Sequence, residues 1–342
     1  MFKLSQKLAL ASAVAFLCLT TQAQAGNVIY NTGNAATATV ALGVNDDGSL
    51  NSQPNITVNG GSTGVAYKFS SDNNWYDGTS PGCACEGWGV SVNNTTSGFA
   101  NVSTDGGANN LSVGAATNVT GSTVTTTTSL ANLPGLTVTH RYAPASSSSD
   151  LFKVSVSITN TTGTTVNDLK YVRVMDWDVP PTEYEEYVTI KGTGTTTSLE
   201  ASHDNGFSTA NPLNGGSGSA GTNNTDFADN GPDDHGAYFR FNFGSLANGE
   251  TFDFSVFFGA AASETAALAA IGAEQIELYS LGQSGGGQVT GSPVTYIFGF
   301  TGVGGTPVEP PANVPEPGSL LLSGMGLMAL WATRRRSSAA TR

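Results

Sequence analysis

Charge is scarce in this sequence, and positive charge is the scarcer kind. Only 11% of the 342 residues are charged, with 13 Lys or Arg against 26 Asp or Glu. Between residues 26 and 333 the imbalance is larger, with 7 basic and 26 acidic residues. Such a surface repels nucleic acid and anionic membranes, so we expect no nucleic-acid partner. An acidic surface attracts cations and basic partners, or it serves only to keep the protein soluble.

Residues typical of catalytic sites are also few. The three histidines, His140, His203 and His235, are scattered and fit no metalloprotease motif. No nucleophile-elbow pattern lies between a strand and a helix. Residues 215–221 repeat Ser and Gly too closely for a phosphate-binding loop. Because no catalytic motif is recognisable, we predict that the protein is not an enzyme.

Cysteine occurs three times. Cys18 lies in an apolar N-terminal run, where Phe16 and Leu17 are too bulky for the usual lipid-attachment site. Cys83 and Cys85 remain, and two cysteines in an oxidising compartment can pair with each other. The alternatives are free or intermolecular thiols, or a metal pair for which no nearby histidine completes a zinc set. We favour the local disulfide.

The residues that favour helices are scarce, whereas Gly, Ser, Thr and Asn dominate. This composition predicts a mostly β protein with turn-rich connections. We expect residues 26–305 to form an antiparallel β-sandwich, either one large sandwich or two packed sandwiches dividing near Pro144. The one predicted helix runs from Glu264 to Ile271, with Ser263 as its N-cap and Gly272 as its stop.

Alternation of apolar and polar residues places the strands. It is clearest from Phe152 to Thr159, after which residues 160–163 form a turn and the chain returns as a strand. The predicted strands are Asn27–Tyr30, Ala36–Val44, Ile56–Val58, Val65–Phe69, Val124–Thr128, Leu136–Tyr142, Phe152–Thr159, Leu169–Met175, Tyr187–Lys191, Ala237–Phe243, Phe252–Phe258, Glu277–Leu281 and Val294–Phe300.

The N-terminus has the three parts of a secretory signal peptide. Lys3 and Lys7 make a basic region, residues 8–19 are apolar, and Ala23 and Ala25 fit the small-x-small cleavage rule. We therefore predict a signal peptide over residues 1–25 and export by the general secretion machinery.

The C-terminus carries a second apolar segment. A Pro-rich spacer over residues 306–317 ends in Val314, Pro315, Glu316 and Pro317, and an apolar run follows from Leu320 to Ala332. We predict a short transmembrane helix over residues 318–333, which at ~1.5 Å per residue is about 24 Å long and short for a bilayer. The arginines that follow predict a cytoplasmic tail over residues 334–342, and these are Arg334, Arg335 and Arg336.

This tail resembles the PEP-CTERM sorting signal of Gram-negative bacteria. Val314 to Pro317 match its recognition tetrapeptide, Leu320 to Ala332 its transient anchor and Arg334 to Arg336 its basic stop. The resemblance implies processing by a membrane-embedded exosortase, with an anchor in the inner membrane that holds the domain in the periplasm before it reaches the cell surface. It also implies an association with exopolysaccharide and biofilm. The alternative is an ordinary tail anchor after a Pro-rich linker.

One acidic stretch follows a predicted strand end. Asp176 and Asp178 lie on one face of the extended chain and Trp177 on the other, and three more acids follow, which are Glu183, Glu185 and Glu186. The aspartates can bind Ca²⁺ through hard oxygens, or they can flank a glycosidic bond while Trp177 stacks on the sugar. They can also be a plain polar loop that caps turns or pairs with Arg173.

A second acidic stretch surrounds Asn230, Gly231 and Pro232. Its acids are Asp226, Asp229, Asp233 and Asp234, followed by His235. Oxygen-rich residues on a turn suit Ca²⁺, although the spacing is not that of an EF-hand. A solvated acidic loop is the alternative.

The sequence therefore predicts an exosortase-sorted surface or matrix β-protein that acts by adhesion or glycan binding. Trp75, Tyr76 and Trp88 are candidates for a sugar platform, or they pack beside the cysteines as a small core. The alternative function is a secreted glycan-cleaving hydrolase that uses the acids near Trp177.

Overall fold

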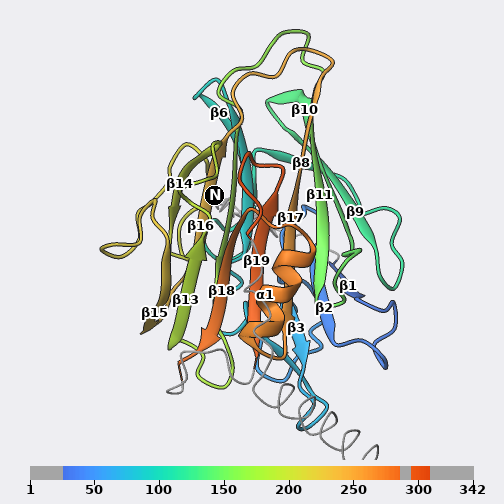
Figure 1. The fold of residues 1–342 in the computed structure, drawn as a ribbon. Coiled ribbons are helices and arrows are strands. Elements are labelled where there is room, and N and C mark those ends of the chain that lie inside the picture. The colour runs from blue at the N-terminus through green and yellow to red at the C-terminus, as the bar shows by residue number, and fades with distance from the viewer. Residues whose placement is uncertain (1–25, 286–293, 309–342) are drawn as a thin grey trace, which may run out of the picture.

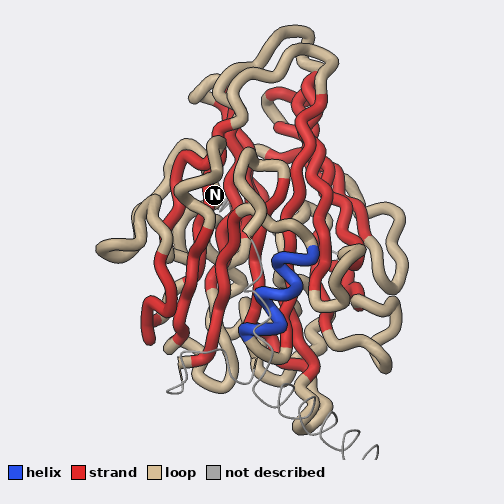
Figure 2. The backbone as a smooth tube through the Cα atoms, viewed as in Figure 1, coloured by secondary structure: helices blue, strands red, loops and turns tan. Residues whose placement is uncertain are grey.

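A computed structural model describes residues 26–285 and 294–308. In this part of the chain it contains nineteen strands and one helix, drawn in Figure 1. The elements are β1 (Gly26–Tyr30), β2 (Val40–Asn45), β3 (Val65–Lys68), β4 (Trp75–Asp77), β5 (Gly87–Val92), β6 (Thr96–Asn101), β7 (Gly107–Asn109), β8 (Leu111–Val113), β9 (Val124–Leu130), β10 (Leu133–Pro144), β11 (Leu151–Asn160), β12 (Lys170–Asp176), β13 (Glu186–Lys191), β14 (Leu199–His203), β15 (Phe227–Asp233), β16 (Gly236–Asn242), β17 (Thr251–Ala261), α1 (Glu264–Ala273), β18 (Leu278–Ser284) and β19 (Thr295–Thr301). The prediction of a mostly β protein with one short helix is confirmed, as Figure 2 shows.

The strands form three sheets. Nine strands lie in the order β15-β13-β18-β19-β17-β11-β10-β9-β8, six in the order β14-β16-β12-β5-β6-β7, and four in the order β1-β2-β3-β4. Neighbouring strands in these sheets pair antiparallel, as β10 does with β11. The nine-stranded and six-stranded sheets both take strands from either side of Pro144, so they do not separate into two units there.

Aromatic side chains join the two larger sheets face to face. Phe239 of β16 lies 5.4 Å from Phe298 of β19, and Tyr171 of β12 lies 4.9 Å from Phe254 of β17, measured between ring centroids. These residues belong to one buried hydrophobic cluster. The alternation that predicted β11 is confirmed, because every second side chain from Phe152 to Ile158 is buried. The arrangement is that of a β-sandwich with a continuous core.

The four-stranded sheet adds to the same core. Its buried side chains Ile29, Leu42 and Val65 belong to the cluster that fills the sandwich, and β3 lies against β17 of the nine-stranded sheet. The helix covers the opposite face of that sheet, in front of β17 and β19 in Figure 1. There Ile271 of the helix packs into a second buried cluster with Phe257.

The helix begins where the sequence predicted but ends later. The Ser263 side chain accepts a hydrogen bond from the Ala266 amide over 3.2 Å, which makes it the N-cap. The predicted stop at Gly272 is wrong, because the helix continues to Ala273 and the left-handed residue that follows it is Gln275, with φ 55°. A glycine can occupy a helix interior at a modest cost, so its presence alone did not mark the end.

Two strand predictions are corrected by the pairing. Residues 56–58 form no strand. The Ile56 amide donates to Thr63 Oγ1 and the Thr57 amide donates to Asn55 Oδ1, so these two amides do not take part in strand pairing. The strands at 152–159 and 169–175 both exist, but they do not pair with each other. β11 lies in the nine-stranded sheet and β12 in the six-stranded sheet, so the turn after Asn160 carries the chain across the sandwich.

Several predictions fall outside the described residues. These are the signal peptide over 1–25, most of the spacer, the transmembrane helix over 318–333 and the basic tail over 334–342. The first residues of the spacer are described, and Val308 donates its amide to the Ile276 carbonyl over 2.8 Å, so this end of the spacer lies on the domain. Within residues 26–285 and 294–308, no helix has the length and apolar character needed to cross a membrane.

Candidate metal centre

Two chain crossings between the large sheets meet at one end of the sandwich. β12 of the six-stranded sheet ends at Asp176, and the chain then crosses to the nine-stranded sheet, where β13 begins at Glu186. The connection from β15 to β16 crosses back between Asp233 and Gly236. Asp176 pairs with Gly236 in one sheet, and Glu186 pairs with Asp233 in the other. The pairing therefore brings together acids that lie up to 58 residues apart in the sequence.

Four carboxyl groups, of Asp176, Asp178, Glu186 and Asp234, form what we call the acid cluster. The three aspartates each place one carboxylate oxygen within 4.8 Å of the others. Asp178 and Glu186 are 0% exposed and Asp176 is 2% exposed, whereas Asp234 is exposed. Among the described residues, Asp176 Oδ1, both carboxylate oxygens of Asp178 and Glu186 Oε2 have no hydrogen-bond partner. Buried polar atoms normally find partners, so these four oxygens require an explanation.

Burial and mutual repulsion change the acidity of the cluster. Burial, followed by the charge of Asp234, raises the pKa of Asp176 to about 8. Burial, followed by the charges of Asp176 and Glu186, raises the pKa of Asp178 to about 10. Burial also raises the pKa of Glu186 to about 9. At neutral pH the cluster therefore either holds protons or holds a cation that offsets the repulsion.

Local contacts hold the cluster in place from both sides. Glu186 Oε1 accepts hydrogen bonds from the amides of Val179 at 3.1 Å and Tyr184 at 2.7 Å, whereas the buried Oε2 has no partner in the described structure. Trp177 points away from the acids into the core, where its Nε1 donates to Ser280 Oγ over 3.1 Å. The prediction that Trp177 lies on the other face from the two aspartates agrees with this arrangement. Because Trp177 is fully buried, it offers no surface on which a sugar can stack.

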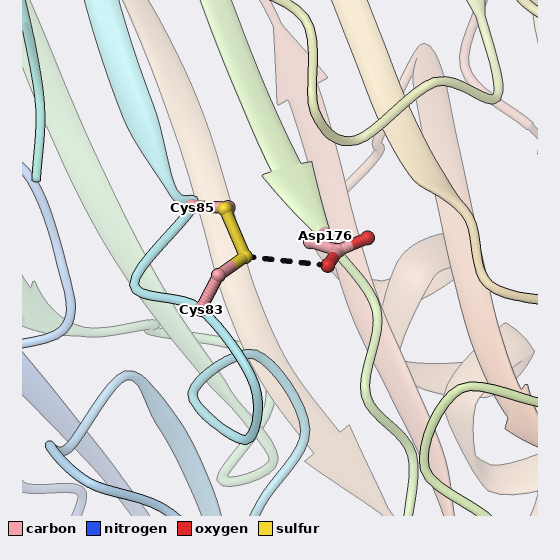
Figure 3. A group of neighbouring side chains, drawn as sticks. All are labelled: Cys83, Cys85 and Asp176. Carbon is pink, nitrogen blue, oxygen red and sulfur yellow. Dashed lines mark hydrogen bonds between the residues drawn. A yellow bond between two sulfur atoms is a disulfide. The ribbon is translucent and has the colours of Figure 1, made fainter. Parts of the chain in front are cut away.

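The cysteines lie beside the cluster (Figure 3). Cys83 and Cys85 are joined by a disulfide, with their Cα atoms 5.2 Å apart. Cys83 Sγ lies 3.5 Å from Asp176 Oδ2, across from the end of β12. Because a disulfide sulfur carries no proton, a hydrogen bond here requires the proton of the Asp176 carboxyl group. The same pairing removes both sulfurs as thiolate ligands.

The structure divides the second predicted acidic stretch. Asp234 joins the acid cluster, but Asp226 accepts from the Thr193 amide and hydroxyl, at 2.9 and 2.7 Å. Asp229 donates its amide to Thr189 Oγ1 over 3.0 Å, and Asp233 Oδ1 accepts from the next amide. Residues 227–233 are strand β15 at the edge of the large sheet rather than a loop. Sequence alone missed the strand because its Asn, Gly and Pro are typical of turns.

Two further predictions are corrected. Trp88 is fully buried in the core, where its Nε1 donates to the Asp47 carbonyl over 2.8 Å, so Trp75, Tyr76 and Trp88 do not form a shared sugar platform. Arg173 does not pair with the aspartates that follow it, because its guanidinium binds Glu86. The sequence did not predict this ion pair. The only indication of it in the sequence is the isolated Glu86 just before the strand that begins at Gly87.

Comparison with known proteins adds information at the C-terminus. A family model described as the PEP-CTERM protein-sorting motif matches residues 313–336. The chain carries a PEP-CTERM sorting signal. The match covers the tetrapeptide Val314 to Pro317, the apolar run and the arginines on which the resemblance was based. No curated protein and no solved structure matches the chain.

The PEP-CTERM signal determines the partner and destination of the chain in broad terms. Such signals are recognised by exosortase, and they imply export and sorting to the membrane or the cell surface. The signal covers only residues 313–336. It therefore carries no information on what the β-sandwich binds.

Proposed function

We propose that the protein is a surface or matrix component whose β-sandwich binds extracellular glycans after export by the general secretion machinery and exosortase sorting. The PEP-CTERM signal at residues 313–336 is the observation that carries the sorting part. The signal peptide over residues 1–25 and a temporary inner-membrane anchor belong to the same proposal. In this role the domain contributes to adhesion or to an exopolysaccharide-rich biofilm.

A pocket lined by uncharged residues next to the disulfide supports the glycan-binding part. It has a volume of about 600 Å³ and is lined by neutral side chains, which include Asn51, Gln53, Ser62 and Ser80. Asn51 is 5% exposed, and its Nδ2 donates to the Thr79 carbonyl over 2.7 Å while its Oδ1 has no partner. Sugar hydroxyls can form hydrogen bonds with the amide and hydroxyl groups that line the pocket. Neutral amides and hydroxyls around a pocket of this size suit an uncharged saccharide.

The alternative of a glycan-cleaving hydrolase has less support. Asp176 and Asp178 would have to lie on either side of a glycosidic bond. Both side chains are nearly or fully buried, and Trp177 between them faces the core. A substrate cannot reach both carboxyl groups without moving the backbone. We therefore propose a binding role rather than a catalytic one.

Replacing Asn51 with glycine is expected to weaken glycan binding by about tenfold, since it removes an amide side chain that lines the pocket. Glycine tolerates the left-handed backbone of Asn51, where φ is 65°. The measurement is binding of the purified mature protein to an array of bacterial polysaccharides. Asn73→Gly is the matched control, because Asn73 also has a left-handed backbone, with φ 61°, but is exposed on a turn away from the pocket.

Equal binding by the wild type and the Asn51→Gly variant would contradict the assignment of this pocket. Binding of no glycan by the wild type would contradict the glycan-binding proposal as a whole. Neither result bears on sorting, which depends on the separate C-terminal signal.

A further inference from the structure

We propose that the acid cluster of Asp176, Asp178, Glu186 and Asp234 is a Ca²⁺ site that links the two large sheets. The three aspartates come from the end of β12, the segment that follows it and the connection between β15 and β16, and Glu186 begins β13 next to them. A cation at this point would therefore tie the two crossings of the sandwich to each other. This inference goes beyond the proposed function, because it requires neither glycan binding nor sorting.

The spacing of the oxygens fits one cation. Ca²⁺ lies about 2.3–2.6 Å from its oxygen ligands, so two ligands of the same ion are at most about 5 Å apart. One oxygen from each of Asp176, Asp178 and Asp234 lies within 4.8 Å of the others. Three carboxylates at this separation repel one another strongly unless a positive charge lies among them.

The unpartnered oxygens are an independent observation. Asp178 is fully buried, and neither of its carboxylate oxygens has a hydrogen-bond partner in the described structure. Protonation would leave this side chain with an unpaired O–H and an unpaired C=O, which is also costly in a buried position. A cation held by the three aspartates satisfies these oxygens and Asp176 Oδ1, and its positive charge offsets the charge of the neighbouring Glu186.

The donor set favours Ca²⁺ over other divalent ions. All the candidate ligands are carboxylate oxygens, because Cys83 and Cys85 are tied in a disulfide. Hard oxygens select Ca²⁺ or Mg²⁺ rather than Zn²⁺, and Mg²⁺ gives up its own water reluctantly. Asp234 is exposed, so the cluster is open to solvent at one end and an ion can enter there.

The backbone around Asp176 is packed too closely to rearrange easily. A Cβ atom added to Gly206 would lie 2.6 Å from Asp176 Cα, and one added to Gly236 would lie 2.7 Å from the same atom. Because glycine has no Cβ, the segments around Gly206 and Gly236 can pack directly against the backbone of Asp176. The fold therefore holds Asp176 in one position before the ion binds. This favours binding, because little conformational entropy is lost when the ion binds.

Thermal unfolding of the purified mature protein tests the site. After treatment with EDTA, addition of CaCl₂ to about 100 times the dissociation constant should raise the Tm by about 5 °C or more. Asp178→Asn should abolish this rise. In EDTA the same variant should unfold close to the Tm of the wild type, because Asn has nearly the same size and shape as the Asp side chain that it replaces. A variant that had only lost a structural contact would be less stable in both conditions.

A second variant and a control complete the test. Asp234→Asn changes an exposed residue, so it should fold normally and bind Ca²⁺ about tenfold more weakly. Asp226→Asn is the control, because its Oδ1 can still accept from Thr193, and it should respond to Ca²⁺ as the wild type does. Terbium luminescence sensitised by the buried Trp177 gives a second readout. An unchanged wild-type Tm in EDTA and in CaCl₂, or an unaltered response of both cluster variants, would overturn the proposal.

Discussion

Replacing Arg173 with methionine is expected to lower the free energy of unfolding by about 3–5 kcal/mol, because it leaves the buried Glu86 without its partner charge. Both side chains are fully buried, and Arg173 Nε binds Glu86 Oε1. The pair joins β12 to the segment before β5. The measurement is urea unfolding of the purified mature protein, followed by fluorescence at two wavelengths so that a two-state transition can be checked.

The surroundings of the pair explain the size of this effect. Arg173 also donates to the Gly48 carbonyl over 3.1 Å and lies over the Phe258 ring, 5.1 Å from its centroid. The other oxygen of Glu86 accepts from the Leu50 amide over 2.6 Å. The pair therefore connects the turn after β2 with both large sheets. Loss of the arginine removes its contacts with Glu86, the Gly48 carbonyl and the Phe258 ring in one step.

Two further variants separate charge from packing. Glu86→Gln alone should also destabilise the protein by several kcal/mol, but the double variant with Arg173→Met should cost less than the sum, since no unpaired charge is left. Arg141→Met is the matched control, because Arg141 is exposed on β10, and it should stay within about 0.5 kcal/mol of the wild type. A change of less than about 1 kcal/mol for Arg173→Met would show that the ion pair is not important for stability.

Replacing Glu316 with alanine is expected to slow processing of the PEP-CTERM signal by about 10- to 100-fold, which corresponds to the loss of one charge-assisted contact of about 1.5–3 kcal/mol. Glu316 lies between Pro315 and Pro317, and each proline restricts the backbone that an enzyme would grip. The substitution does not change the apolar run from Leu320 to Ala332. The uncut precursor should therefore accumulate in the membrane fraction.

Mass spectrometry of the C-terminus measures this outcome. Glu309→Ala is the matched control, because Glu309 also precedes a proline but lies outside the matched residues 313–336. This variant should be processed like the wild type. If the wild-type protein still ends at Arg342 in a cell that contains an exosortase, processing at this signal does not occur. Equal processing of the Glu316 and Glu309 variants would show that the exosortase does not recognise the Glu316 carboxylate.

Local patterns predicted the elements that depend on near neighbours. The alternation from Phe152 to Ile158 is a property of consecutive residues, and β11 follows it. The N-cap at Ser263 depends on an amide three residues away, and it is also present. The end of the same helix was not predicted, because Gln275 takes the left-handed conformation and the buried Ile276 follows it in the second cluster. The helix preferences of individual residues do not take into account the packing of Ile276 into the core.

Long-range pairing decided what local patterns could not. Residues 227–233 have the composition of a turn, yet they form β15 because β13 offers a free edge in the large sheet. The connection between β15 and β16 then places Asp234 beside Asp176 and Asp178, which the sequence had assigned to a different site. Arg173 likewise forms its ion pair with Glu86, 87 residues away, and not with the acids that follow it in the sequence.

The sorting signal and the β character of this protein could both be predicted from the order of its amino acids. The address is a linear signal from Val314 to Arg336, and an enzyme reads such a signal along the chain without any tertiary fold. The tertiary structure decided which acids meet, which of them are buried and where Trp177 points. The physical reason is that the charge and solvation of a carboxyl group depend on its neighbours in space, and in an antiparallel sandwich those neighbours are set by strand pairing.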